Sequence, residues 1–308
     1  MIWVLPLLGA AAVTVAGPLA ERLRPAVPRS GKDGGEYRFV RLSRGVTCYR
    51  WDGPVNGPVA VCVHGLTTAS HVWDAVVRVL VLMGFRTLRY DLYGRGRSDR
   101  PDGVQDRAFF LTQLRELLDA QGVDGRFTLI GYSMGGAIAS AFAAAHPERL
   151  ERLVLLAPSG LGHLTSRAGR FAERVPVLGD SLMLLLGGVL LRREIRRSAT
   201  EPCAVEGLPA AQMAETRTRG FLPAVLSSRR HMLREDMEPC HRRIAAQRIP
   251  VLAIWGESDP VIPLSAMGRL AQVNPAARHE MVEGAGHGLP YTHPKHIHAA
   301  LQSFLREV

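Results

Sequence analysis

The sequence predicts an α/β fold in which a mostly parallel sheet carries helices on both faces. Short runs of apolar or alternating residues recur along most of the chain, and longer helical patterns separate them. Strands that alternate with helices imply right-handed crossovers between parallel neighbours. The rhythm breaks over residues 160–247, where no apolar strand-like run occurs, so a helical insertion into the sheet domain is expected.

The expected elements follow one another in a regular order. Two alternating runs, 37–42 and 46–51, are separated by a few residues and predict a hairpin. The run 58–63 is nearly all apolar, as expected of a strand that is covered on both faces. Further strands are expected at 85–90, 126–131, 151–157, 250–255 and 278–283. Helices are expected at 71–83, 105–121, 134–145, 264–273 and 294–306.

The composition excludes several classes of protein. With 308 residues, 47% of them hydrophobic and 21% charged, the chain can bury a large core and is not disordered as a whole. Only one stretch is long and apolar enough to cross a bilayer, which excludes a polytopic membrane protein. The four cysteines share no short spacing, so a disulfide scaffold and a Cys-rich zinc module are excluded. A disulfide between Cys203 and Cys240, both in the insertion, stays open.

The amino-terminal segment, residues 1–24, begins with an uncharged apolar stretch, Met1–Ala20. As a helix this stretch would span about 30 Å, enough for the hydrocarbon core of a membrane. Basic residues follow it, which predicts a membrane anchor with the rest of the chain on the cytoplasmic side: Arg22, Arg24, Arg29 and Lys32. A cleaved signal, with a secreted or periplasmic product, and a docked helix are the alternatives. Residues 25–36, rich in Pro, Gly and charge, are expected to form a linker.

The most informative motif is Gly131-Tyr132-Ser133-Met134-Gly135-Gly136, which lies between an expected strand and an expected helix. A sharp strand-to-helix turn at this point lifts the serine hydroxyl above the sheet. Side chains at Gly131 and Gly135 would collide with the neighbouring strand and helix. The amino end of the helix also directs backbone N–H groups toward developing negative charge. Ser133 is therefore the candidate nucleophile, and an ordinary Gly/Ser turn is the alternative.

A serine nucleophile needs a base, and the base needs a carboxylate that orients it. The loops 256–260 and 284–288 follow two of the expected strands, at the edge of the sheet where ligands bind. They contain Asp259 and His287, with Glu257 as an alternative acid. Both loops leave the sheet on the same edge as the turn at Ser133, so the three side chains are expected to converge.

In these features the chain resembles enzymes of the α/β-hydrolase fold, on their esterase and monoacylglycerol-lipase side. The resemblance rests on His64-Gly65-Leu66, Asp91-Leu-Tyr-Gly-Arg-Gly-Arg-Ser98, the motif at Ser133, Asp259 and His287, which occur in the order of that family. It implies an eight-stranded, mostly parallel sheet with helices on both faces. The hydrolase core would comprise residues 37–159 and 249–308, and residues 160–248 would form a helical cap over the site.

The resemblance also assigns roles to individual residues. Ser133 would be the nucleophile, His287 the general base and then acid, and Asp259 its orienting partner. The backbone N–H groups of Leu66 and Met134 would form the oxyanion hole. His64 would organise its loop without taking part in the chemistry. No cofactor and no metal are implied.

Charge is concentrated in the expected cap. The chain carries a formal charge of +10, and residues 160–248 hold 15 Arg against 9 Asp and Glu. An apolar run, 175–191, lies beside these arginines and can either pack on the core and line an apolar pocket or dip into a bilayer. In the second case the headgroups would meet Arg192, Arg193, Arg196 and Arg197. Nucleic-acid binding is excluded because no recognition module occurs and aromatic residues make up only 6%.

The sequence therefore predicts a membrane-associated serine hydrolase that acts on a carboxylic ester with an apolar acyl chain, such as a monoacylglycerol-like lipid. Enzymes of the same fold that cleave carbon–carbon bonds of vinylogous diketones carry the same Ser-His-Asp set, so they remain an alternative. Perhydrolase or acyltransferase activity is a further alternative, and a non-catalytic ligand receptor is one from another class. The oligomeric state is not predicted.

Overall fold

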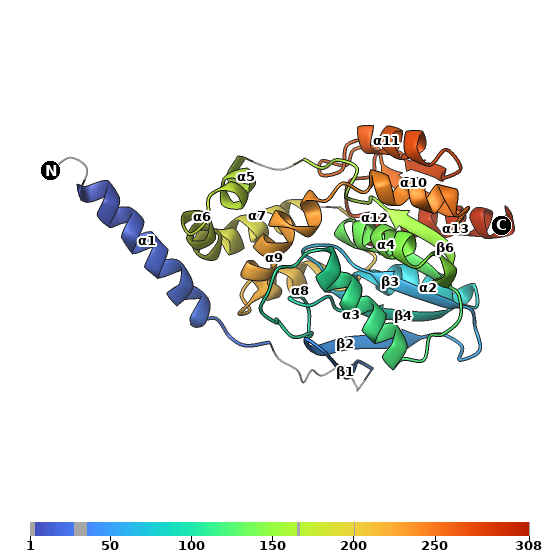
Figure 1. Ribbon diagram of the computed structural model, residues 1–308, viewed down its shortest axis with the longest axis horizontal. Helices are drawn as coiled ribbons and strands as arrows, with labels where there is room; N and C mark the ends of the chain where they lie inside the picture. Colours follow the sequence, from blue (N-terminus) through green and yellow to red (C-terminus); the bar gives the residue numbers. More distant parts are fainter. Residues whose placement is uncertain (1–3, 28–35, 165–166, 200, 308) are drawn as a thin grey trace.

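Eight strands form one sheet in the computed structural model, which describes residues 4–27, 36–164, 167–199 and 201–307 (Figure 1). The strand order is β1-β2-β4-β3-β5-β6-β7-β8. The pairs β1–β2 and β2–β4 are antiparallel, and all the other pairs are parallel. The predicted eight-stranded, mostly parallel sheet is confirmed. The strands are β1 (Arg38–Leu42), β2 (Gly45–Asp52), β3 (Val59–Val63), β4 (Arg86–Tyr90), β5 (Phe127–Tyr132), β6 (Leu150–Leu156), β7 (Val251–Gly256) and β8 (Arg278–Val282).

The central strands are apolar because helices cover both faces of the sheet. Every residue of β5 and of β7 is buried. The helices α4 and α10 pack against each other, as do α2 and α13. The helices outside the insertion are α1 (Val4–Arg22), α2 (Asp74–Leu82), α3 (Arg107–Ala120), α4 (Met134–Ala145), α11 (Ser265–Val273), α12 (Leu289–Thr292) and α13 (Pro294–Glu307), with short turns η1 (Ser70–Trp73) and η2 (Pro147–Arg149). The four-residue α12 was not expected from the sequence.

Helices fill the predicted insertion between β6 and β7. Most of them stand beyond the edge of the sheet (Figure 1), and the last, α10, packs on α4 and α11. A separate apolar cluster, Leu184, Phe221, Leu222 and Val225, lies among the helices of this insertion, residues 160–248, for which the name cap is used below. The helices of the insertion are α5 (Arg167–Arg174), α6 (Leu178–Leu182), η3 (Met183–Gly187), α7 (Gly188–Ser198), α8 (Leu208–Glu215), α9 (Phe221–Arg230), η4 (Met232–Arg234) and α10 (Glu238–Ala246).

The amino-terminal helix α1 packs along α6 and η3 of the cap. A Cβ at Gly17 would lie 2.6 Å from Ser181 Cα, so the two helices touch at their backbones. The Ser181 hydroxyl donates to the Thr14 carbonyl at 3.3 Å. Within the described ranges, no helix combines the length and the apolarity needed to cross a membrane. The expected linker, residues 25–36, falls mostly outside the described residues.

All four cysteines lie in the described part of the chain, and all are free thiols. Cys240 is buried on α10, whereas Cys203 is exposed. The disulfide between these two residues that the sequence left open is therefore not formed.

Candidate active site

Ser133 occupies the turn between β5 and α4, with φ 54° and ψ −119°. Glycine is required on both sides of it. A Cβ at Gly135 would lie 2.1 Å from the Val63 carbonyl oxygen, and one at Gly131 would lie 2.4 Å from the Gly135 carbonyl oxygen. A side chain at either position would therefore collide with strand β3 or helix α4, as expected from the sequence. Glycine at both positions lets the turn pack closely against the sheet.

Main-chain hydrogen bonds hold the strained conformation of Ser133. Its N–H donates to the Leu156 carbonyl at 3.0 Å, and its carbonyl accepts from the Ser159 N–H at 3.0 Å. A non-glycine residue in such a region costs about 1–3 kcal/mol and persists only when its surroundings enforce it. The end of strand β6 and the loop after it supply that enforcement, and the Ser133 side chain is thereby held in the wall of the pocket described below.

The side chains of Ser133, His287 and Asp259 form a hydrogen-bonded chain. His287 Nε2 lies 2.9 Å from Ser133 Oγ, and His287 Nδ1 lies 2.8 Å from Asp259 Oδ2. Because an ionised carboxylate only accepts hydrogen bonds, it favours the imidazole tautomer with the proton on Nδ1. Nε2 is then the nitrogen that can accept the proton of the serine hydroxyl.

The Asp259 carboxylate is almost inaccessible to water, with 1% of its side chain exposed. Its other oxygen, Oδ1, accepts from the N–H groups of Val261 at 2.7 Å and of Ile262 at 3.0 Å. The alternative acid, Glu257, instead accepts from the Gly284 N–H at 2.9 Å and is exposed. Asp259 is thus the carboxylate that contacts His287, whereas Glu257 contacts Gly284, at the start of the loop that contains His287.

Tyr132, which the sequence analysis did not single out, supports the histidine loop. Its hydroxyl donates to the His287 carbonyl at 3.0 Å, and the two rings lie 5.3 Å apart between centroids. Burial raises the pKa of Tyr132 well above its usual value, so the hydroxyl remains a donor. Its place next to Ser133 in the motif was the only signal in the sequence that could have identified it.

The two backbone N–H groups predicted for the oxyanion hole come from different elements. Leu66 lies in the loop after β3 and Met134 is the first residue of α4. His64 orders the loop, because its Nε2 accepts from the Leu92 N–H at 2.9 Å and its Nδ1 lies 2.8 Å from the Gly65 carbonyl. Burial lowers the pKa of His64 to about 4, so the ring is neutral at pH 7. This geometry agrees with an organising role for His64.

A pocket of about 580 Å³ opens above Ser133 and His287. The core loops and the cap both contribute to its walls. Its apolar side chains are Leu66, Leu164, Leu191, Ile195, Phe221, Leu233 and Val261. Its charged and hydroxyl groups from α7 and the loop after it are Glu194, Arg197, Ser198 and Glu201. The apolar side chains can receive a hydrocarbon chain, and the charged groups of α7 line the same pocket.

Nothing in the described ranges has the donor set of a metal centre, since no group of three or more His, Cys, Asp and Glu side chains could hold an ion. His293 and His296 lie near each other at the start of α13, with ring centroids 5.6 Å apart. The Thr292 hydroxyl is 2.8 Å from His293 Nδ1, which gives that ring a local partner.

A family model described as the alpha/beta hydrolase fold matches residues 58–294. The chain therefore belongs to the alpha/beta hydrolase fold family, and the prediction of an ester-cleaving hydrolase is confirmed at this level. It is 26% identical over 285 residues to monoacylglycerol lipase abhd6-A of Xenopus laevis, covering 88% of this chain and 80% of the relative. It is 26% identical over 260 residues to Lipase 1 of Psychrobacter immobilis, covering 82% and 78%.

A solved structure of a hydrolase from Pseudomonas aeruginosa PA01 resembles the whole arrangement. It superposes with a TM-score of 0.73 at 28% sequence identity, covering 89% of this chain and 99% of that chain. The likeness therefore includes both the sheet and most of the insertion.

Proposed function

We propose that the protein hydrolyses carboxylic esters with an apolar acyl group through an acyl-enzyme on Ser133. The observation that carries the proposal is the hydrogen-bonded chain of Ser133, His287 and Asp259, of which Ser133 and His287 line the pocket. A nucleophile within hydrogen-bond reach of its base, with the base oriented by a buried carboxylate, is the arrangement that acyl transfer requires. The lipases among its relatives support the assignment.

The reaction would take place in two halves. In the first, Ser133 Oγ attacks the ester carbonyl while His287 Nε2 accepts its proton. The N–H groups of Leu66 and Met134 stabilise the oxyanion, and His287 then protonates the departing alcohol. In the second half, His287 removes a proton from water, which attacks the acyl-enzyme. Collapse of this second tetrahedral intermediate releases the acid and returns the proton to Ser133.

The apolar part of the pocket lining supports an apolar acyl group. Side chains such as Leu191, Phe221 and Val261 provide hydrocarbon surface near the nucleophile. Burial of each methylene of a substrate contributes about 0.8 kcal/mol, so chain length should raise catalytic efficiency until the pocket is filled. A volume of about 580 Å³ is in the range of pockets that enclose small organic ligands. A lipid monoester has suitable chemistry.

Labelling with a fluorophosphonate tests the nucleophile. We expect wild-type protein to be labelled and Ser133→Ala to remain unlabelled. Ser133→Ala and His287→Ala should each lower kcat by about four to six orders of magnitude, because the groups act as one unit. Both variants should keep the wild-type circular dichroism spectrum. Folded wild-type protein that resists the probe would reject the enzyme and favour a non-catalytic receptor.

A panel of p-nitrophenyl esters of increasing acyl length, assayed beside a vinylogous diketone, tests the substrate class. We expect kcat/KM to rise with acyl length and the diketone to be a poor substrate. Turnover of the diketone alone would replace the ester assignment by carbon–carbon bond hydrolysis on the same residues.

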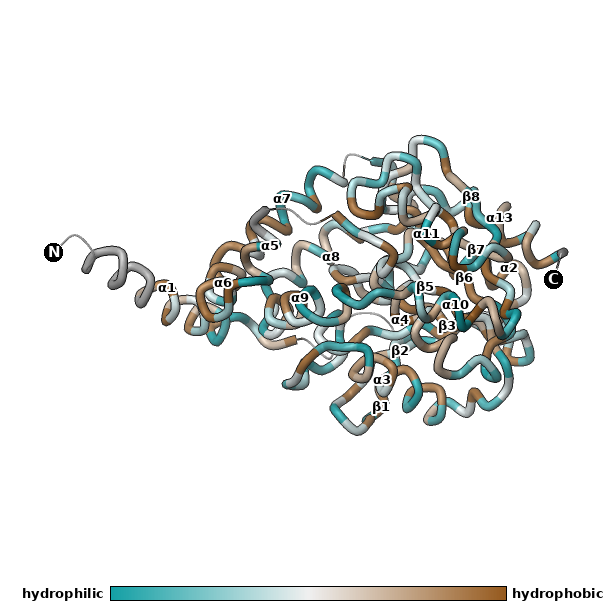
Figure 2. Tube along the Cα trace, turned by 45° about the horizontal axis from the view of Figure 1, so that its top comes forward, coloured by the Kyte–Doolittle hydropathy of each residue, from teal (hydrophilic) through white to brown (hydrophobic). Residues whose placement is uncertain are grey.

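We further propose that the protein works at a membrane surface. Large apolar side chains are exposed on α1, directly after it and on the adjoining part of the cap: Val15, Leu19, Leu23, Leu186, Val189 and Leu190. Figure 2 shows brown apolar stretches at this end of the molecule. Arg193 and Arg196, both exposed, follow on α7. Apolar side chains next to arginines are typical of surfaces that bind anionic lipid. The cytoplasmic orientation stays a prediction from the arginines that follow the apolar segment.

A further inference from the structure

Arg95 is a completely buried arginine in the loop that follows β4, outside the residues assigned to catalysis above. Its guanidinium makes five hydrogen bonds, all of them to neutral acceptors. No carboxylate among the described residues lies within ion-pair distance of it, and the buried Glu215 attracts it from beyond that distance. A buried cation without such a partner is costly, so its retention points to a task that a smaller or apolar side chain could not perform.

One edge of the guanidinium holds the loop of the oxyanion hole. Arg95 Nε donates to the Leu66 carbonyl at 3.0 Å. This bond restrains the peptide group that follows Leu66. The N–H of Leu66, which lies in the peptide group before it, is the one proposed to bind the oxyanion. The Leu66 side chain also packs against the apolar cluster of the cap that contains Phe221 and Leu222. The residue is therefore held on both its main chain and its side chain.

The other edge of the guanidinium is attached to cap helix α9. Arg95 Nη2 donates to Ser228 Oγ at 2.8 Å and to the Ala224 carbonyl at 3.4 Å. Nη1 donates to Gln105 Oε1 and to the Tyr93 carbonyl, and Ser228 Oγ donates to the same Gln105 oxygen at 2.7 Å. The loop also fits closely against α9, since a Cβ at Gly94 would lie 2.4 Å from Ala224 Cβ.

The guanidinium geometry suits this double attachment. Its nitrogens donate in a rigid planar fork, so fixing one edge on α9 fixes the direction of the other. Burial lowers the pKa of Arg95 to about 9, which still leaves the group charged at neutral pH. Charged donors form stronger hydrogen bonds than neutral ones, and the bond to the Leu66 carbonyl is of this kind.

We propose that Arg95 is a positioning residue that fixes the oxyanion loop at Leu66 and makes its geometry depend on the seating of cap helix α9. The inference rests on the proposed function, because it concerns the same oxyanion hole. It predicts that the Leu66 loop has the geometry needed for the reaction only when α9 packs against the loop that contains Arg95.

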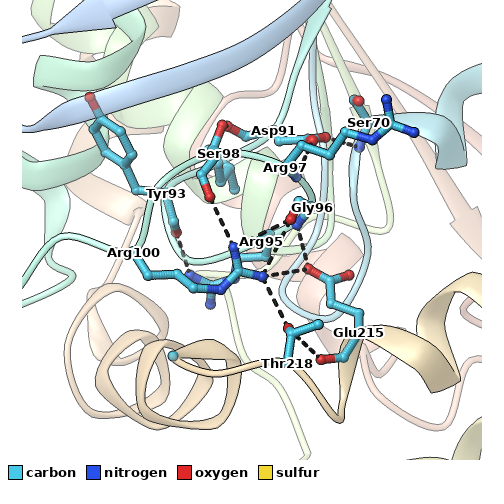
Figure 3. Close-up of polar contacts among 12 residues, drawn as sticks. Ser70, Asp91, Tyr93, Arg95, Gly96, Arg97, Ser98, Arg100, Glu215 and Thr218 are labelled. Atoms are coloured by element: carbon cyan, nitrogen blue, oxygen red, sulfur yellow. Dashed lines mark hydrogen bonds and ion pairs between the residues drawn. The ribbon is translucent and has the colours of Figure 1, made fainter. Parts of the chain in front are cut away.

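Arg100 offers a matched control, because it also joins this loop to the cap without touching Leu66. Figure 3 shows its guanidinium between the loop carbonyls of Gly96 and Ser98 and the cap residues Glu215 and Thr218. Substitution of Arg100 therefore removes contacts with Glu215, the last residue of α8, and with Thr218, and it spares the contacts of Arg95 with Leu66 and α9. Any effect that Arg95 variants have beyond those of Arg100 variants belongs to the oxyanion loop.

The test compares Arg95→Met, Arg95→Lys and Arg100→Met in full-length protein with a p-nitrophenyl ester. Loss of one oxyanion-hole donor costs about a hundred- to a thousandfold in kcat, and misplacement of one should cost less. We expect kcat to fall about ten- to a hundredfold in both Arg95 variants, with KM within about threefold of wild type. Arg95→Lys keeps the charge but cannot span Leu66 and α9 together. Arg100→Met should retain kcat within about threefold.

A pair of inhibitors separates positioning from a purely structural role. A trifluoromethyl ketone forms an oxyanion adduct with Ser133, whereas the matching secondary alcohol cannot. We expect the Ki of the ketone to rise in proportion to the loss of kcat/KM in Arg95 variants. The Ki of the alcohol should stay unchanged. An equal rise for both compounds would show that the pocket itself had been disturbed and would overturn the proposal.

Ser228→Ala tests the cap end of the connection and serves if an Arg95 variant does not fold. Removing this one acceptor should lower kcat about three- to tenfold and should weaken the ketone but not the alcohol. Wild-type kcat in Ser228→Ala would refute the dependence on α9. Wild-type kcat in folded Arg95→Lys would refute the positioning role. Both results differ from failure of the proposed function, in which the wild-type protein neither reacts with fluorophosphonate nor cleaves esters.

Discussion

At the scale of single residues, the geometry of the site is kept because hydrogen bonds restrain the side chains of Asp259 and His287 to few conformations. Asp259 accepts hydrogen bonds on both oxygens, from His287 on one and from two backbone N–H groups on the other. A carboxylate restrained in this way cannot turn away from the imidazole. His287 is restrained in turn through its carbonyl by the Tyr132 hydroxyl. Ser133 therefore contacts an imidazole whose position and tautomer are restrained by Asp259 and Tyr132.

Asp259→Asn should lower kcat by about four orders of magnitude while the fold is retained, because an amide can donate to His287 Nδ1 and so favours the wrong tautomer. Steady-state kinetics on a p-nitrophenyl ester would measure the loss. Glu257→Gln is the matched control, since Glu257 contacts the Gly284 N–H and not the histidine. A comparable loss in Glu257→Gln, with activity retained in Asp259→Asn, would exchange the two assignments.

At the scale of elements, α1 and the cap behave as one structural unit. Glu21 is buried at the end of α1 and accepts a hydrogen bond from the Gly220 N–H. Arg24 donates to the carbonyls of Thr216, at 2.6 Å, and Leu184, at 2.9 Å. Thr216 and Phe221, the residue after Gly220, both line the pocket. Truncation of α1 would thus remove cap contacts as well as apolar surface, so point substitutions give the cleaner test of membrane binding.

The double substitution Val189→Asp and Leu190→Asp on α7 should reduce binding to anionic lipid vesicles by about tenfold or more, because each exposed apolar side chain loses its burial in the interface. Vesicle co-sedimentation would measure it. Binding should also weaken as salt is raised, through screening of the arginines. Leu82→Asp is the matched control, because Leu82 is 83% exposed on α2, at the other end of the molecule (Figure 1). Equal losses in both proteins would refute a membrane surface on the cap.

At the scale of the whole molecule, buried titratable groups link the stability of the fold to pH. His64 and His241 are both fully buried, and burial lowers the pKa of each to about 4. An unfolded histidine has a pKa of about 6.5. Between these values the unfolded chain binds protons that the folded chain does not, so the free energy of unfolding falls as pH decreases. Burial raises the pKa of Glu215 to about 7, which acts in the opposite direction.

The free energy of unfolding should therefore be lower at pH 5 than at pH 7, with each of the two histidines contributing about 2 kcal/mol to the loss. His241→Leu should reduce this loss by about 2 kcal/mol. The substitution breaks no hydrogen bond, because neither ring nitrogen of His241 has a hydrogen-bond partner in the described residues. Urea unfolding at the two pH values would measure both proteins. Glu215→Gln should increase the loss, because the folded protein no longer gains a proton there. An identical pH dependence in all three proteins would contradict this account.

Much of the fold and of the candidate site could be predicted because local patterns carry them. Apolar runs separated by helical patterns predict the sheet, and the glycines around Ser133 predict the turn. The expected helix 134–145 agrees with α4 at both ends. Its first residue could be predicted because the turn at Ser133 determines where the helix begins. The elements around the loops that hold Asp259 and His287 were likewise expected. The order of these loops along parallel strands brings their side chains to one edge of the sheet.

The sequence by itself determined the family, the strands and the loops that converge on Ser133, because each depends on neighbours in the chain or on the rules of parallel sheets. Only the tertiary structure decided that Asp259 and not Glu257 meets His287, that α1 packs on the cap, and that Arg95 joins Leu66 to α9. These last contacts link Arg95 to residues as far along the chain as Ser228. Such contacts depend on the packing of side chains across elements, and no local pattern in the chain encodes that packing.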